Sequence, residues 1–220
     1  MLTNSQQKLI KSLHTKKGRQ KTDLCLVEGK KNIELAADLI EYTFTKEDTP
    51  QFDKLVTTET PQDIAGVAKI PAYKLEDIKK HDCIVVLDNI QDPGNVGTIL
   101  RLCLGFDAAL ILINSADPTS PKVIRSSAGA VFQTNWLKST ENDLKNFKRK
   151  TYRLEISKNA QALPPQTKLN KKCLIIAGNE GQGIKLNIKG DSININHNPK
   201  LESLNVATAL SIILHHKFQQ

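Results

Sequence analysis

Apolar positions along this chain follow two spacings. Short runs of consecutive apolar residues, rich in β-branched side chains, are typical of strands buried on both faces of a parallel sheet. The clearest such runs are residues 83–87, 108–113 and 173–177. In 96–104 and 204–218, apolar residues instead recur every three or four positions, which predicts amphipathic helices. Strands and helices in alternation predict an α/β fold with a mostly parallel sheet.

The N-terminal part of the chain contains shorter elements. The pattern predicts an amphipathic helix near the start, strands at 23–29, 42–45 and 54–58, a helix at 30–39, and a helix or turn beginning at Thr60. The stretch that follows is polar and charged, as linkers between domains are. We therefore predict a small α/β domain over residues 1–75, a linker over 76–82 and a larger domain over 83–220.

Composition and charge narrow the choice of partner. With 39% hydrophobic and 25% charged residues, the 220-residue chain has an ordinary globular composition. Its net charge of +8 favours a polyanionic partner, whereas 5% aromatic residues disfavour base stacking as the main binding mode. Four cations near the N-terminus are therefore candidate phosphate contacts, with a solvated surface cluster as the alternative. They are Lys16, Lys17, Arg19 and Lys21.

The four cysteines lie far apart and form no metal-binding pair, and three of them fall inside apolar runs. Buried free thiols in a reducing compartment are therefore expected. No apolar run approaches the roughly 20 residues that span a bilayer, and the first ten residues lack the apolar core of a signal peptide. We expect a cytoplasmic protein without a metal site and without a membrane partner.

Residues 87–101, LDNIQDPGNVGTILR, carry the strongest chemical signal. An apolar strand ends there in a turn with Pro93 and Gly94, and Asn95 is a candidate N-cap of the helix that follows. Such a strand–loop–helix places polar groups at the carboxyl edge of a sheet, where open α/β folds bind ligands. Arg101 is the only charged residue in the first two turns of that helix. A solvated surface arginine is the alternative to a functional one.

Two further segments combine glycine with polar side chains. Residues 178–183, GNEGQG, follow a buried strand, but they lack the Gly-Lys-Ser/Thr ending of a P-loop and the GxGxxG spacing of a dinucleotide site. Three glycines there indicate a close approach of the backbone, while Glu180 would repel a phosphate. Near the C-terminus, Ser203 and Asn205 stand at the start of the last helix, where a plain capping turn is the alternative.

Taken together, three strings resemble the signature motifs of the SpoU (TrmH-type) RNA 2′-O-ribose methyltransferases of the SPOUT superfamily. They are LDNIQDPGNVG followed by Arg101, GNEGQG at 178–183, and ESLNV at 202–206, in the family's order and spacing. The similarity extends weakly into residues 19–29 and 60–62. The resemblance implies a small L30e-like N-terminal RNA-binding domain, followed by a SPOUT α/β domain with a C-terminal deep trefoil knot. It also implies a homodimer that packs through the knot region.

The same resemblance implies S-adenosylmethionine as cofactor and assigns site residues. The family's catalytic positions correspond to Asn95, Arg101, Glu180, Ser203 and Asn205. Its cofactor-binding positions correspond to Gly178, Asn179, Gly183, Ile195 and Leu204. RNA contacts would come from Lys16, Lys17, Arg19 and Lys21.

Arg101 has two interpretations. The family assigns it the role of general base, but a guanidinium hardly deprotonates. We therefore favour a cation that holds the neighbouring phosphate and stabilises the developing 2′-alkoxide, with Glu180 orienting it. A sulfonium methyl is already an activated electrophile, so alignment with the ribose oxygen is the main requirement.

The chain departs from the family in the loop before the third motif. Ile195, Asn196 and His197 stand where many members have Ile-Pro-Met, and Pro199 stands where a glycine is common. The predicted function is S-adenosylmethionine-dependent methylation of a ribose 2′-hydroxyl in ribosomal RNA, which the N-terminal domain favours over transfer RNA. The alternatives are a transfer RNA 2′-O-methyltransferase and a catalytically idle RNA-binding protein of the same fold. A nucleotide-dependent oxidoreductase conflicts with the glycine spacing.

Overall fold

The computed structural model describes residues 1–145, 147–156, 161–162 and 168–220. The chain divides into two compact units. Unit 1 comprises Met1–Ala72 and Asp117–Gln133, and unit 2 comprises Tyr73–Ala116 and Thr134–Gln220. The segment 117–133 therefore belongs to the N-terminal unit, although the sequence pattern placed it in the larger C-terminal domain.

Unit 1 is built on a three-stranded antiparallel sheet with strand order β1-β3-β2. Its elements are α1 (Asn4–Leu13), α2 (Lys16–Thr22), β1 (Leu24–Glu28), α3 (Lys30–Leu35), η1 (Ala37–Leu39), β2 (Ile40–Thr45), α4 (Phe52–Leu55), β3 (Ile64–Lys69), α7 (Pro121–Ser126) and η2 (Ala130–Phe132). Apolar side chains from α1, α4 and all three strands form its core, including Ile10, Phe44, Phe52 and Val67. Phe44 and Phe52 pack with ring centroids 5.6 Å apart.

Two predictions in unit 1 were wrong. Residues 54–58 were expected as a strand, but the chain forms the helical turn α4 up to Leu55, and Leu55 is fully buried in the core. Of the helix or turn expected from Thr60, the helix is wrong: the chain bends at Thr60 and Asp63 and then enters the central strand β3, which begins at Ile64 and pairs with both neighbours. Tertiary pairing overrides weak local preference in short segments such as these.

One buried and one partly exposed ion pair join the segment 117–133 to the rest of unit 1. Arg19 Nη2 lies 2.7 Å from Asp117 Oδ2, and Arg19 Nε donates to Thr119 Oγ1. Arg125 Nη1 lies 3.2 Å from Glu28 Oε1, and the Glu28 carboxylate also accepts backbone N–H groups from Thr57 and Thr58. The buried side chains of Arg19 and Glu28 are thus paired and hydrogen-bonded, as buried charges must be.

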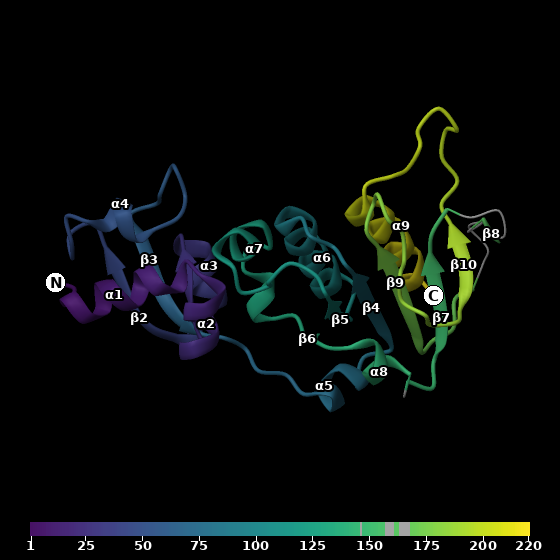
Figure 1. Cartoon of the computed structure of the whole chain (residues 1–220), viewed down its shortest axis with the longest axis horizontal. Coiled ribbons are helices and arrows are strands. Elements are labelled where there is room, and N and C mark those ends of the chain that lie inside the picture. The colour runs from purple at the N-terminus through teal and green to yellow at the C-terminus, as the bar shows by residue number, and fades with distance from the viewer. Residues whose placement is uncertain (146, 157–160, 163–167) are drawn as a thin grey trace. The chain divides into compact units, whose positions relative to one another are not determined.

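Unit 2 contains a seven-stranded sheet with strand order β6-β5-β4-β9-β7-β10-β8, and every neighbouring pair is parallel (Figure 1). Its elements are α5 (Leu75–Lys79), β4 (Cys83–Asp88), α6 (Pro93–Gly105), β5 (Ala108–Ile113), β6 (Trp136–Lys138), α8 (Glu141–Leu144), β7 (Lys150–Leu154), β8 (Gln161–Ala162), β9 (Cys173–Gly178), β10 (Asp191–Asn194) and α9 (Val206–Phe218). The predicted α/β fold with a parallel sheet is confirmed.

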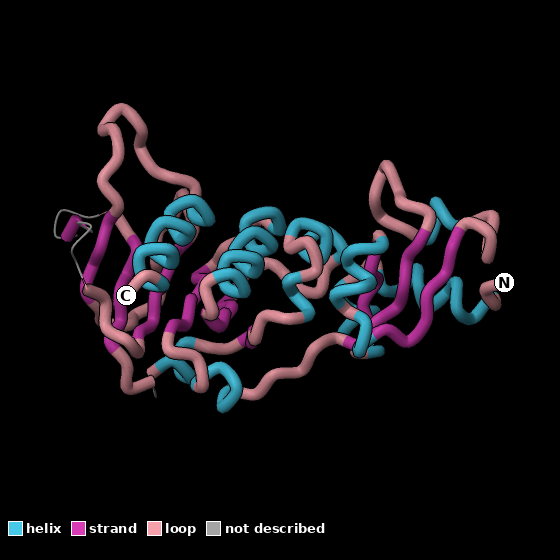
Figure 2. Tube along the Cα trace, turned by 180° about the vertical axis from the view of Figure 1, so that it is seen from behind, coloured by secondary structure: helices cyan, strands magenta, loops and turns pink. Residues whose placement is uncertain are grey.

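Helices cover the central strands of this sheet. α6 packs against α9, and Figure 2 shows the two helices side by side. β4 is buried along its whole length, because both of its faces are covered, which explains its continuous apolar sequence. The predicted linker 76–82 contains most of α5, whose Ile78 is buried in the core of unit 2. Within the described residues, none of the helices is long and apolar enough to cross a lipid bilayer.

Candidate functional site

The register of β4 and β9 brings the first two motifs together. Asp88 at the end of β4 pairs with Gly178 at the end of β9, so the loops that follow leave the same edge of the sheet side by side. Asn89 adopts a left-handed conformation with φ 59°, which asparagine tolerates, and its backbone C=O accepts from Asn179 Nδ2 at 3.2 Å. Asn89 Nδ2 in turn donates to Gln182 Oε1 at 3.2 Å.

The helix α6 begins with the turn chemistry that the sequence indicated, shifted by three residues. Asp92, rather than Asn95, is the N-cap, and its Oδ2 accepts from Asn95 N at 2.7 Å. Pro93 stands in the first turn, where its missing N–H costs nothing. Because Asn95 is not the cap, its side-chain amide is available for other contacts.

The loop 178–183 is compact. A Cβ on Gly178 would lie 2.3 Å from the backbone carbonyl of Gly183, so no side chain fits there. Gly183 has φ +67°, in the region that favours glycine. Asn179 Oδ1 closes the loop by accepting from the backbone N–H groups of Gly181 and Gln182. Glycine in this loop thus serves close backbone packing.

A hydrogen-bond network joins the third motif to the other two. Glu180 Oε1 accepts from Asn95 Nδ2 at 3.2 Å, from Asn205 Nδ2 at 3.0 Å and from Val206 N at 3.3 Å. Asn205 Nδ2 also lies 2.9 Å from Asn95 Oδ1. Asn205 is the N-cap of α9, because its Oδ1 accepts from the backbone N–H groups of Ala207 and Thr208 in the first turn of that helix. Residues up to 110 positions apart in the sequence therefore meet at one point.

A cavity of about 750 Å³ opens beside the 178–183 loop, within the size range of small-molecule sites. Seven of the predicted site residues line it: Gly178, Asn179, Glu180, Gly183, Ile195, Ser203 and Leu204. The chain from 195 to 205 that supplies three of them forms the long yellow loop between β10 and α9 in Figure 1. The structure thus brings these residues together around one hollow.

Arg101 is not among the residues that line this cavity, and neither are Asn95 and Asn205. Arg101 is exposed on α6, six residues after Asn95, so it lies about 120° around the helix from it. In the part of the chain that the structure describes, its guanidinium makes no hydrogen bond or ion pair. A single chain therefore assembles the cavity but leaves this cation free on its surface.

Among the cavity residues that the sequence reasoning missed, two carry polar side chains. Glu155 follows β7 and Asn194 ends β10, and both line the cavity. Neither lies in a motif or has a residue pattern of its own around it. Only the pairing of β7 with β10 brings them together, and no local signal in the sequence predicts that pairing.

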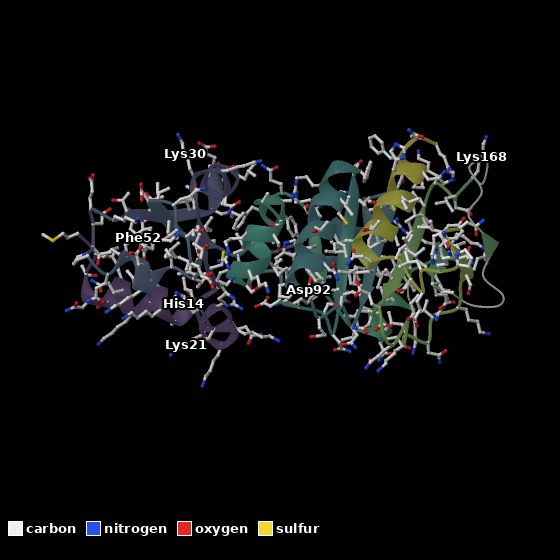
Figure 3. All side chains as sticks on the ribbon, turned by 90° about the horizontal axis from the view of Figure 1, so that it is seen from above. His14, Lys21, Lys30, Phe52, Asp92 and Lys168 are labelled. Atoms are coloured by element: carbon white, nitrogen blue, oxygen red, sulfur yellow. The ribbon has the colours of Figure 1, made fainter. Side chains whose placement is uncertain are left out.

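The predicted basic cluster is divided by burial. Lys16, Lys17 and Lys21 are exposed, as a phosphate-binding surface requires. Arg19 is only 3% exposed, with its guanidinium bound to Asp117, Thr119 and the backbone C=O of Leu13. Its assignment as an RNA contact is therefore corrected: Arg19 is a buried structural cation. Figure 3 places Lys21 and Lys30 on opposite sides of unit 1, with Phe52 between them.

Comparison with known proteins shows which family the chain belongs to. A sequence model of the SpoU rRNA Methylase family matches residues 82–215. The 23S rRNA (guanosine(2553)-2′-O)-methyltransferase RlmP of Bacillus subtilis is 31% identical, over 97% of this chain and 96% of the relative.

Two solved structures are similar over nearly the whole chain. A Porphyromonas gingivalis protein assigned to the TrmH family of RNA methyltransferases has a TM-score of 0.86 and 26% identity, and the match covers 100% of both chains. An AdoMet-bound rRNA methyltransferase from Sinorhizobium meliloti has a TM-score of 0.82 and 25% identity, covering 98% of this chain and 95% of that one. The chain therefore belongs to the SpoU rRNA methylase family.

Proposed function

We propose that this protein transfers the methyl group of S-adenosylmethionine to a ribose 2′-hydroxyl of ribosomal RNA. One observation carries the proposal: the three motifs meet in one hydrogen-bonded network beside a cavity of cofactor size. Relatives named as ribosomal RNA 2′-O-methyltransferases support the substrate class. RlmP acts on a guanosine, and guanosine is therefore the target nucleoside that we infer for this chain.

The cavity suits S-adenosylmethionine in size and in lining. The close packing of Gly178 on Gly183 leaves backbone groups of the loop at the cavity surface, where a flat adenine can approach them. Ile195 and Leu204 provide apolar surface on the other loop. The solved Sinorhizobium meliloti relative is described as AdoMet-bound, which supports the same cofactor here. These residues would hold the adenosyl group mainly through backbone contacts and packing.

The reaction requires little covalent chemistry from the protein. When bound, the cofactor supplies a methyl group that its sulfonium has already activated. Glu180 holds Asn95, Asn205 and the start of α9 in one arrangement, and so fixes the cavity wall. Arg101 binds the phosphate next to the target ribose and stabilises the negative charge that develops on the 2′-oxygen. Ser203 lines the cavity from the same loop as Leu204 and helps to exclude water.

We place the complete active site between two copies of the chain. Because Arg101 does not line its own chain's cavity, a partner's copy of this residue can supply the cation. The helices α6 and α9 pack together, and each exposes large apolar side chains, with Leu104 41%, Ile212 41% and Phe218 60% exposed, which suits a homodimer interface. A deep trefoil knot formed by the chain around α9 belongs to the same proposal. Sedimentation analysis tests the dimer.

Unit 1 would bind the RNA. Its antiparallel sheet flanked by helices is compatible with the L30e-like domain that the sequence resemblance implies. Lys16, Lys17 and Lys21 are exposed and can contact phosphates. A cytoplasmic location, where the four free and buried cysteines stay reduced, completes the proposal.

The decisive experiment combines binding and turnover. The purified protein is expected to methylate unmodified ribosomal RNA with labelled S-adenosylmethionine, and mapping of 2′-O-methyl positions identifies the nucleotide. The Arg101→Ala variant is expected to lose turnover by about a hundredfold or more, because one charge-stabilising group is removed. Its affinity for S-adenosylmethionine, measured by calorimetry, should change by no more than a few fold.

The matched control is Lys189→Ala, which removes an exposed cation of unit 2 that does not line the cavity. It should keep turnover. Full turnover in Arg101→Ala contradicts the role given to this residue. A wild-type protein that binds RNA but no S-adenosylmethionine is instead the catalytically idle RNA-binding protein, and a wild-type protein that methylates only transfer RNA overturns the substrate class.

A further inference from the structure

One wall of the cavity is formed by the ends of β7 and β10. The two strands pair in parallel with Ile193 beside Leu154, and the pairing continues as Glu155 N donates to Ile193 O at 3.1 Å. Glu155 therefore comes next to Asn194, and both residues line the cavity. Side chains of paired residues lie on the same face of a sheet. This wall thus presents two polar side chains next to each other.

The Glu155 carboxylate is held in a fixed position. Its Oε1 accepts from Arg153 Nε at 3.2 Å and from Ser192 Oγ, and its Oε2 accepts from Arg153 Nη2 at 3.2 Å. Arg153 is itself anchored, because its Nη1 donates to the backbone C=O groups of Leu186 and Ile188. A carboxylate can accept about four hydrogen bonds, so one position on Oε2 remains for a ligand.

The charge on Glu155 is maintained as well. Partial burial raises the pKa of this carboxyl, but the hydrogen bonds from Arg153 and Ser192 outweigh burial and hold the pKa below its usual range. At neutral pH the group is therefore an ionised acceptor without a proton to donate. A ligand that meets it must bring a hydrogen-bond donor.

Asn194 has an acceptor without a partner. Its Oδ1 is buried and finds no hydrogen bond among the described residues. Leaving a buried acceptor unpaired costs about 1–3 kcal/mol, and such atoms are rare in folded proteins. Because Asn194 lines the cavity, a ligand donor is the natural partner for this atom.

Two acceptors on neighbouring strands, about 4.8 Å apart at the backbone, match a ligand with two adjacent O–H donors. We infer that Glu155 and Asn194 bind the ribose 2′,3′-diol of the S-adenosyl cofactor and so make this chain selective for an intact ribose. Carboxylates bind ribose hydroxyls in the same way in dinucleotide sites. The inference rests on the methyl-transfer function proposed above and names residues outside the three motifs.

The test compares ligands that differ by one hydroxyl. Calorimetry of the full-length wild-type protein should show at least one of the 2′-deoxy and 3′-deoxy analogues of S-adenosylhomocysteine binding about tenfold or more weakly than the parent. In Asn194→Leu and in Glu155→Ala, affinity for the parent should fall, and the penalty for that analogue should shrink to about twofold or less. The ratio of the two affinities, for the parent and for the deoxy analogue, reports on the contact with the hydroxyl. A general distortion of the cavity would weaken both ligands and leave the ratio unchanged.

Asn194→Leu also separates binding from folding. Because Asn194 Oδ1 has no hydrogen-bond partner among the described residues, the melting temperature of the ligand-free variant should stay at or above the wild-type value. Asp191→Ala is the matched control, since Asp191 is an exposed carboxylate on β10 that does not line the cavity, and it should keep the full penalty for the deoxy analogue.

Three results would overturn the inference. Wild-type protein could bind the deoxy analogues as tightly as the parent. Asn194→Leu could keep the wild-type penalty, or could lower the melting temperature and weaken all three ligands equally. If wild-type protein binds none of the S-adenosyl ligands, the proposed methyl-transfer function fails first.

Discussion

At the scale of single residues, the close approach of Gly178 to Gly183 decides the shape of the cofactor loop. A Cβ on Gly178 would lie 2.3 Å from the Gly183 carbonyl and 2.5 Å from Ile184 N, both of which are backbone atoms that cannot rotate away. We expect Gly178→Ala to lower the free energy of unfolding by about 1–3 kcal/mol and to weaken S-adenosylhomocysteine binding. Chemical denaturation and calorimetry measure the two effects.

Gly181→Ala is the control in the same loop, because a Cβ there meets only Asn179 Oδ1 at an ordinary contact distance of 3.6 Å. This variant should keep both stability and binding close to wild type. Equal effects from both substitutions would show that flexibility of the loop, rather than close backbone packing, explains its glycines.

Glu155 gives a pH prediction with a definite sign. Since the pKa of its folded-state carboxyl lies below the usual value of 4.5, the unfolded state binds more protons as the pH falls below that value. The stability that this group contributes is present above about pH 4.5 and is lost as the pH falls through the folded pKa. Melting curves from pH 6 to pH 3 should therefore fall less steeply for Glu155→Gln than for wild type. Parallel curves would contradict the hydrogen bonds from Arg153 and Ser192.

At the scale of elements, Asn205 links the start of α9 to the network around Glu180, and two substitutions separate its roles. Asn205→Ala removes the N-cap and should destabilise the protein by about 1 kcal/mol. Asn205→Ser keeps a capping oxygen without a charge but removes the Nδ2 group that donates to Asn95 and Glu180. We expect Asn205→Ser to unfold closer to wild type than Asn205→Ala does, while both lose most turnover. Retained turnover in Asn205→Ser would show that the cap alone matters.

The elements also show how far local patterns predict the fold. The strands β4, β5 and β9 appear where continuous apolar runs predict them, because strands covered on both faces need such sequences. The predicted strand at 54–58 and the helix considered from Thr60 are wrong, because short segments take their structure from pairing partners and core contacts. The N-cap of α6 lies three residues earlier than predicted, since both Asp92 and Asn95 fit the capping pattern.

At the scale of the whole molecule, Arg19 shows why a charge cluster needs the tertiary structure to be interpreted. Arg19 and Asp117 have side chains 4% and 10% exposed, and breaking such a pair leaves an uncompensated buried charge. We expect Arg19→Leu to lower the free energy of unfolding by about 3–5 kcal/mol. Lys17→Ala should leave the free energy of unfolding within about 0.5 kcal/mol of wild type. The same variant should bind RNA more weakly, and the slope of log affinity against log salt concentration should become shallower by about one. Denaturation and RNA titrations at several salt concentrations measure both.

If Arg19→Leu unfolds like wild type and its RNA binding depends less on salt, Arg19 contacts RNA after all.

The interaction of Arg19 with Asp117 also explains why the segment 117–133 belongs to unit 1. Charged partners in the segment 117–133 attach it to unit 1, so the chain passes between the two units three times. Nothing in the local pattern of that segment predicts this arrangement, because its partners lie about a hundred residues earlier.

The sequence alone determined the α/β alternation, the three motifs and the family resemblance, because periodicity, turn residues and short polar strings are local properties of a chain. Only the tertiary structure decided that Glu180, Asn95 and Asn205 share hydrogen bonds, that Arg101 stays outside its own cavity, and that Glu155 meets Asn194. These contacts depend on which strands pair and in which register, as between β4 and β9 or β7 and β10. Register is set by the packing of the whole sheet, so no single stretch of sequence carries it.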